Sequence, residues 1–184
     1  QLSKFDLLQY FDLDGITYGN NVYFTYEDQN ASIWLGTLGS GLVKLDANNN
    51  IERIYPKLGA GNSESESVRS ILQDTKGTYW IGTPTEGLFI FDPKTGYNKQ
   101  VASVQQGNLN NNTIRSIFED KYGTIWLGTN VGLSGKDSNT NHFKHYQADS
   151  LHKNNSIYEI IEHPTEDKLV IASFRGGLQL FDLN

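Results

Sequence analysis

The sequence predicts an all-β fold made of several copies of one small antiparallel sheet. A motif of Trp in an apolar run, then Gly-Thr and Gly-Leu, occurs around positions 34, 80 and 126, which are 46 residues apart each time. A fourth, weaker copy, "KLVIASFRGGL", has Val170 in place of Trp. No helical 3.6-residue periodicity separates the copies. A repeat of this length is typical of stacked supersecondary units.

Each copy begins with a short strand that ends on a carboxylate or a histidine. These four predicted strands are apolar, β-branched and aromatic, and they span residues 21–28, 67–74, 113–120 and 156–163. Tight Asp-x-x-Gly turns follow at 74–77 and 120–123, where Asp can accept hydrogen bonds from turn amides and Gly supplies a positive φ. A second strand, which carries the Trp, comes next.

The rest of each copy supplies two more strands. The third runs from Gly-Leu to an Asp, and a more polar fourth strand follows at 51–57, 97–103 and 142–147. Four antiparallel strands per copy predict a β-propeller of four four-stranded blades, either a closed ring or a fragment of a larger propeller. We expect residues 1–184 to form a single domain or segment, and residues 5–11 can complete the last blade, which lacks a fourth strand of its own.

The residues of the repeated motif are interpreted first as packing residues. Trp fits as the large plate between neighbouring blades, and the Gly after it is expected to let an adjacent backbone approach closely. In the third copy, Ser134 and Gly135 stand where Phe89 and Ile90 stand in the second, so we expect poorer packing there.

Composition excludes several classes of function. Fifteen Lys and Arg against 21 Asp and Glu give a net charge of −6, with no basic block, which argues against a nucleic-acid partner. No apolar window approaches 18 residues, so no direct membrane insertion of this segment is expected. Cysteine is absent, no zinc or nucleophile-elbow motif occurs, and the Asp-x-Asp-Gly of 11–16 lacks the other calcium ligands. We therefore predict no catalytic residue, metal or cofactor.

One set of candidate ligand-binding residues comes from the first strands. The residue after the first apolar position of each strand is Tyr23, Arg69, Arg115 or Tyr158. Two guanidiniums and two phenols at equivalent blade positions can form a polar, aromatic ring suited to sugar hydroxyls or carboxylates. The alternative is that the arginines pair with carboxylates of neighbouring blades and the tyrosines fill space.

A second set comes from the loops between the second and third strands. These loops vary, "LGS", "PTE", "NV" and "FR", while their flanks do not, and variation on a fixed frame can encode specificity. Their chemically useful members are Glu86, Asn130, Phe174 and Arg175.

These motifs resemble the two-component regulator propeller repeat, found in tandem in the extracytoplasmic sensor regions of bacterial hybrid histidine kinases. "TIRSIFEDKYGTIWLGTNVGL" follows the repeat almost throughout, and "SVRSILQDTKGTYWIGTPTEGLFIFD" does so except that Glu66 replaces an Asn. The first copy has Ala31 for the turn Gly, and the fourth lacks Trp, Gly and Thr. The resemblance implies a periplasmic or extracellular sensor segment, usually of more than four blades, that responds to oligosaccharides.

The functional hypothesis is noncatalytic sensing of an oligosaccharide, or another small polar ligand, by part of a bacterial two-component receptor. One alternative is a protein–protein interaction scaffold, which includes association into a homodimer. The other is a propeller polysaccharide lyase or glycosidase, in which acidic residues of different blades would assemble. Linear spacing supports no such acidic pair.

Overall fold

The computed structural model describes residues 21–59, 65–136, 142–146 and 156–183, and within them the regular elements are all β-strands. Each strand coincides with one of the predicted apolar or polar runs of a repeat. The strands are β1 (Val22–Glu27), β2 (Ile33–Thr37), β3 (Leu42–Leu45), β4 (Ile51–Tyr55), β5 (Ser70–Gln73), β6 (Tyr79–Gly82), β7 (Leu88–Phe91), β8 (Asn98–Ala102), β9 (Ile114–Glu119), β10 (Ile125–Thr129), β11 (Gly132–Lys136), β12 (Phe143–Tyr146), β13 (Ser156–Glu162), β14 (Lys168–Phe174) and β15 (Gly177–Asp182).

The strands form four antiparallel meanders, one for each repeat. Their orders are β1-β2-β3-β4, β5-β6-β7-β8, β9-β10-β11-β12 and β13-β14-β15. The all-β propeller prediction is therefore confirmed. The predicted completing strand of the fourth sheet, residues 5–11, lies outside the described residues, as does the Asp-x-Asp-Gly stretch at 11–16.

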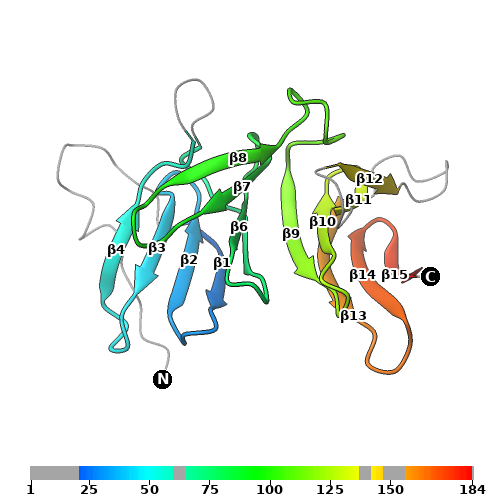
Figure 1. The fold of residues 1–184 in the computed structure, drawn as a ribbon, viewed down its shortest axis with the longest axis horizontal. Coiled ribbons are helices and arrows are strands. Elements are labelled where there is room, and N and C mark those ends of the chain that lie inside the picture. The colour runs from blue at the N-terminus through cyan, green and yellow to red at the C-terminus, as the bar shows by residue number, and fades with distance from the viewer. Residues whose placement is uncertain (1–20, 60–64, 137–141, 147–155, 184) are drawn as a thin grey trace.

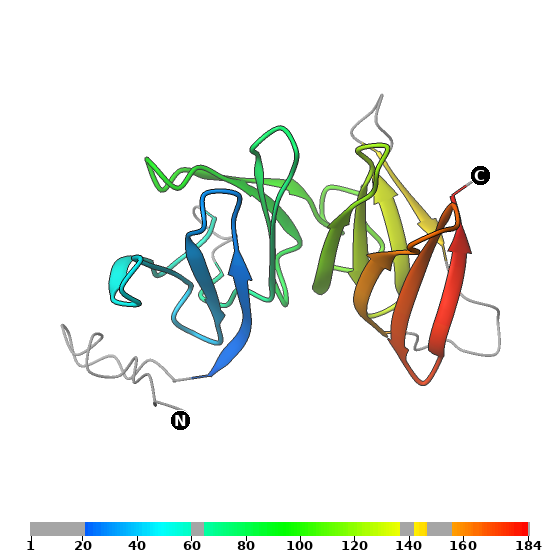
Figure 2. The ribbon, with the colours of Figure 1, turned by 90° about the horizontal axis from the view of Figure 1, so that it is seen from below.

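Successive sheets pack face to face in chain order. The inner strands β1, β5, β9 and β13 contact one another in sequence, and β10 and β11 also contact β13. In both views the first and fourth sheets lie at opposite ends of this row (Figures 1 and 2), with the inner strand β9 between the two halves. Among the described strands, the first sheet makes no comparable contact with the fourth sheet. Within the described part of the chain, no helix is long and apolar enough to cross a membrane.

The tryptophans fill the spaces between sheets, as predicted. Trp34 is fully buried among Tyr55, Tyr79 and Phe91, with its ring centroid 5.6 Å from that of Tyr79 and 6.0 Å from that of Phe91. Trp80 occupies the next junction, and Trp126 the one after it. Burial of such large rings supplies much of the apolar area that holds neighbouring blades together.

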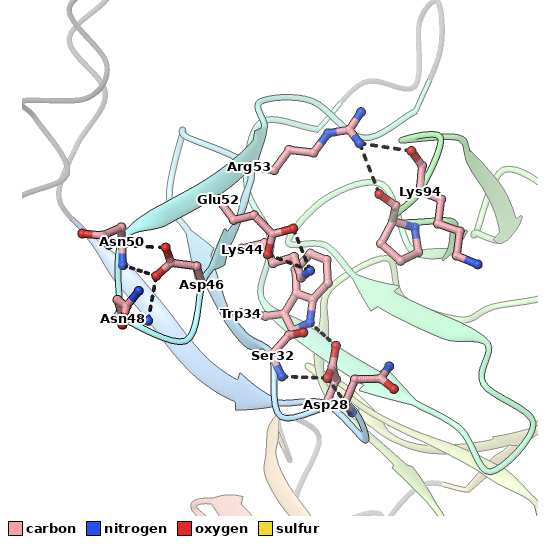
Figure 3. A network of polar contacts seen from close by, with 12 residues as sticks. Asp28, Ser32, Trp34, Lys44, Asp46, Asn48, Asn50, Glu52, Arg53 and Lys94 are labelled. Carbon is pink, nitrogen blue, oxygen red and sulfur yellow. Dashed lines mark hydrogen bonds and ion pairs between the residues drawn. The ribbon is translucent and has the colours of Figure 1, made fainter.

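A buried carboxylate fixes the first tryptophan (Figure 3). The Oδ2 atom of Asp28 accepts a hydrogen bond from Trp34 Nε1 at 2.8 Å. The same atom accepts a second one from the Tyr79 hydroxyl of the next sheet at 2.7 Å. Its Oδ1 atom accepts the amides of Asn30 and Ser32, each at 2.9 Å. Asp28 thus closes its own turn, orients the indole and links the first two sheets. The sequence predicted the turn but not the hydrogen bond to the indole.

The same device recurs in the next two repeats. Trp80 Nε1 donates to Asp74 at 2.8 Å, and Trp126 Nε1 donates to Asp120 at 2.7 Å. Both aspartates also accept two turn amides. In the fourth repeat His163 replaces the Asp, and its Nδ1 atom accepts the Glu166 amide at 3.0 Å. The turn is kept where the indole is absent.

The glycine after each Trp has a different role from the expected one. A Cβ on Gly82 would clash with the Ser70 hydroxyl and lie 2.6 Å from Cγ2 of Ile114, a side chain of the next sheet. Gly128 stands in the same relation to Ser116 and Ile157. The expectation of an approaching backbone is therefore wrong: side chains, not backbone, fill these spaces.

The expectation of poor packing in the third sheet is also wrong. A Cβ on Gly135 would lie 2.6 Å from the Trp126 ring, so that ring occupies the space which a larger residue would take. Ser134 is fully buried and its hydroxyl lies 2.8 Å from His145 Nδ1. In the third sheet the Trp126 indole fills the space over Gly135, and the Ser134 hydroxyl has a hydrogen-bond partner. These contacts take the place of the larger Phe89 and Ile90 side chains of the second repeat.

Candidate ligand-binding site

The first predicted set of site residues gathers along the four inner strands. Tyr23, Arg115 and Tyr158 lie in β1, β9 and β13, and Arg69 directly precedes β5. Because these strands lie side by side, residues at equivalent repeat positions reach the same region. Arg69, Arg115 and Tyr158 line a cavity of about 310 Å³ to which all four inner strands contribute, whereas Tyr23 is not among the lining residues.

The two arginines stack on the two tyrosines. The Arg69 guanidinium carbon lies 4.7 Å from the Tyr23 ring centroid, and that of Arg115 lies 4.6 Å from the ring centroid of Tyr158. Each pair joins neighbouring repeats. Among the described residues no carboxylate forms an ion pair with either arginine, so the alternative of Arg–carboxylate pairing is not found there. The tyrosines do not simply fill space, since Tyr23 is 39% and Tyr158 50% exposed.

A loop residue from the second predicted set reaches the same place. Asn130, between β10 and β11, accepts a hydrogen bond from Arg115 Nε at 2.5 Å, and its carbonyl accepts one from the Ser156 hydroxyl at 3.3 Å. Partial burial and, next, the positive charge of Arg69 hold the pKa of Arg115 below its usual value. Both guanidiniums line the same cavity, so two like charges share its border.

The turn between β14 and β15 extends this array outward. The Phe174 ring lies 6.5 Å from the Tyr158 ring, centroid to centroid, and the Arg175 guanidinium carbon lies 5.3 Å from the Phe174 ring centroid. Arg175 adopts a left-handed backbone with φ of 68°. These contacts make two groups, the Tyr23–Arg69 pair and a row from Arg115 through Tyr158 and Phe174 to Arg175, and both groups reach the same cavity through their arginines. We call this set the inner-strand array: Tyr23, Arg69, Arg115, Asn130, Tyr158, Phe174 and Arg175.

Glu86 is the predicted residue that the structure does not bring into this array. Its amide donates to the Thr83 hydroxyl at 2.9 Å, and its carbonyl accepts from Gln100 at 2.6 Å. Its side chain is not among those that line the cavity. Hydrogen bonds of its backbone hold this loop residue within the second sheet, so Glu86 lies outside the inner-strand array.

Sequence reasoning missed the residues that shape the cavity wall. Phe24, Tyr26 and Phe118 line it together with Ser116. Ser116 is buried, with a hydroxyl that has no hydrogen-bond partner among the described residues. Their positions could have suggested them, because they follow the predicted Tyr and Arg residues along the same strands. The face of the sheet to which each side chain points, however, depends on the register of the strands. Among the described residues no group of three or more His, Asp or Glu side chains is placed to hold a metal ion.

Comparisons with known proteins agree with this architecture. The model of the two component regulator propeller family matches residues 62–85 and 108–131. The extracellular domain of BT4673 from B. thetaiotaomicron, named as a hybrid two component system, is 28% identical with a TM-score of 0.75. That match covers 100% of this chain and 23% of that one. No curated protein sequence matches the chain.

More distant structures share the fold alone. The extracellular domain of BT3049, a second hybrid two component system of B. thetaiotaomicron, is 18% identical over 95% of this chain and 29% of that one, with a TM-score of 0.63. Virginiamycin B lyase from Staphylococcus aureus is 10% identical over 94% of this chain and 61% of its own, with a TM-score of 0.64. The chain thus spans about a quarter of the sensor domains it matches. The family model thus matches segments of the second and third repeats, and the four repeated sheets are similar to the propellers of these sensor domains.

Proposed function

We propose that this chain is the ligand-recognition part of a periplasmic or extracellular two-component sensor and binds an oligosaccharide without catalysing a reaction. The observation that carries the proposal is the inner-strand array. It offers exposed aromatic rings beside guanidinium donors at the edge of a cavity, and sugar sites combine these two features because rings cover the apolar sugar face while donors meet the hydroxyls. The BT4673 domain, from a hybrid two component system, supports the sensory role.

Direct binding measurements test this proposal. We expect isothermal titration against a panel of neutral and acidic oligosaccharides to find at least one that binds, with Tyr158→Ala weakening it. Tyr97→Ala is the matched control, because Tyr97 is also a largely exposed tyrosine but lies outside the cavity, directly before β8 of the second sheet. Absence of binding across the panel, or equal loss in both variants, would contradict sugar recognition at this site.

The outer face of the fourth sheet favours the interaction alternative. Ile161, Val170 and Leu180 are paired across β13, β14 and β15, and Leu178 lies on the same face. Leu178 is 74% and Leu180 56% exposed. Val170 holds the position at which Trp34, Trp80 and Trp126 pack against the next sheet. In the first three repeats the equivalent face packs against the next sheet. Among the described residues no further sheet covers this face in the fourth repeat.

As a second candidate function, we propose that a second copy of the chain packs on this face. Burial of exposed leucines drives such association, at roughly 25 cal/mol per Å² of apolar surface removed from water. Sedimentation velocity should then show a monomer–dimer equilibrium that Leu178→Glu shifts to monomer. A wild-type chain that remains monomeric at high concentration would exclude it. No specific observation among the described residues favours the remaining alternative, a propeller lyase or glycosidase.

A further inference from the structure

We propose that Arg69 and Arg115 together bind an anionic substituent of the ligand, a carboxylate or a sulfate group carried on a sugar. This inference rests on the proposed function, recognition of an oligosaccharide at the inner-strand cavity, and adds the chemical class of the sugar. Its starting point is that two guanidiniums share the border of one cavity without a carboxylate bound to either among the described residues.

The two arginines differ from the cations of this chain that pair with carboxylates. The chain carries a net charge of −6, and some described lysines form such pairs, as Lys44 does with Glu52 at 2.8 Å and Lys121 with Asp167 at 2.6 Å. Two like charges side by side oppose each other and favour any anion that comes between them. A free anionic group is the partner that such a pair lacks.

The geometry leaves hydrogen-bond donors for that anion. The guanidinium carbons of Arg69 and Arg115 lie over the rings of Tyr23 and Tyr158, and Asn130 takes only the Nε–H of Arg115. The terminal N–H groups of a guanidinium match the two oxygens of a carboxylate or sulfate in a forked pair. The stacked rings also restrict the arginine side chains, which lowers the entropy lost on binding.

Nearby acidic groups do not already satisfy this pair. Glu159 is the carboxylate that contributes to the described lining of the cavity, and the structure gives it no ion pair with either arginine. Glu159 is exposed on β13, at an irregularity where the register with β14 shifts between Ile157 and Glu159. The cavity therefore holds more positive than negative charge at its border.

The test compares sugars that differ only in charge. Isothermal titration would use a uronic-acid oligosaccharide, the same sugar after its carboxyl groups are reduced to alcohols, and a sulfated oligosaccharide. Wild type is compared with Arg69→Gln, Arg115→Gln and the control Arg53→Gln. Arg53 also stacks on a tyrosine, with its guanidinium carbon 4.9 Å from the Tyr55 ring centroid, but it lies outside the cavity and donates to carbonyls.

We expect at least one charged sugar to bind the wild-type chain about 10- to 100-fold more tightly than the neutral form, the range for a hydrogen bond to a charged group. Arg69→Gln and Arg115→Gln should remove that difference, whereas Arg53→Gln should keep it. Preference for the sulfated over the uronic-acid sugar, or the reverse, identifies the anion. Equal binding of charged and neutral sugars would overturn the anion inference and leave oligosaccharide recognition standing.

A second measurement decides the case in which no sugar binds and the proposed function fails. The Nε–H resonances of Arg69 and Arg115 in proton–nitrogen correlation spectra would be followed during titration with sodium sulfate and sodium acetate, against sodium chloride at equal ionic strength. Saturable shifts at both arginines and not at Arg53 would support an anion site that serves another ligand. Identical responses to all three salts would overturn it.

Discussion

Replacing Asp28 with alanine should be among the most destabilising single changes in this chain. The carboxylate is buried and accepts four hydrogen bonds, two of them from the buried groups Trp34 Nε1 and the Tyr79 hydroxyl. Each buried donor left without a partner costs about 1–3 kcal/mol. With two such donors, we expect Asp28→Ala to lower the free energy of unfolding by about 4 kcal/mol, a large share of a typical domain's stability.

Asp46 provides a matched control within the same sheet (Figure 3). Its Oδ1 atom accepts the amides of Asn48 and Asn50, each at 2.8 Å, so it closes a turn as Asp28 does. It is only partly buried and bonds to neither an indole nor a phenol among the described residues. Asp46→Ala therefore removes the turn contribution alone, and we expect a clearly smaller loss than in Asp28→Ala.

The assay is urea unfolding followed by far-ultraviolet circular dichroism and by tryptophan fluorescence. Tyr79→Phe removes one donor without stranding the carboxylate, so it should cost about 1.5–3 kcal/mol, the range for a hydrogen bond to a charged group. In that background Asp28→Ala should cost less, because one stranded donor is gone. Equal losses for Asp28→Ala and Asp46→Ala, or strict additivity of Asp28→Ala with Tyr79→Phe, would refute the reasoning.

Three further predictions follow from the same contacts. Gly82→Ala should cost about 1–3 kcal/mol in urea unfolding, because its methyl group would overlap Ile114; an unchanged midpoint would contradict this packing. Gly135→Ala should displace the Trp126 ring, and a tryptophan emission maximum identical to wild type would argue against that overlap. Burial alone would raise the pKa of Asp28, but its four hydrogen bonds outweigh burial and lower it. The stability that this carboxylate supplies is therefore present above its unfolded pKa near 4 and is lost as pH falls through the folded value. Asp28→Asn should flatten the acid limb of stability against pH, and an unchanged slope would contradict the assignment.

The blade pattern could be predicted from the sequence because each strand buries residues at a fixed repeat position. The Trp spacing located the second strand of three sheets, and the polar runs located the fourth. The hydrogen bonds of Asp28 were not predictable, since Tyr79 lies 51 positions along the chain and meets it only after two sheets have packed. Packing across a junction depends on the facing side chains, which linear spacing does not fix.

The candidate site was predictable in part for the same reason. Tyr23, Arg69, Arg115 and Tyr158 hold equivalent positions, so adjacent inner strands necessarily bring them near one another. Their pairing as Arg-on-Tyr stacks was not foreseen, because it depends on rotamers that the neighbouring strand selects. Glu86 lies outside the array for a local reason: its backbone amide and carbonyl bond to Thr83 and Gln100 within the second sheet.

The fourth repeat shows that Asp and Trp behave as one structural unit. An aspartate without its indole would leave a buried carboxylate short of a donor, and an indole without its aspartate would bury an unpaired N–H. This repeat has neither residue: His163 takes the Asp position and Val170 the Trp position. His163 keeps the turn through its hydrogen bond with the Glu166 amide, and Val170 has no polar side-chain atom that needs a partner.

Restoring only Trp at position 170 should therefore stabilise the chain less than Val170→Trp combined with His163→Asp. Urea unfolding of the two single variants and of the double variant would measure that coupling. Additive single effects would show instead that the two positions changed independently.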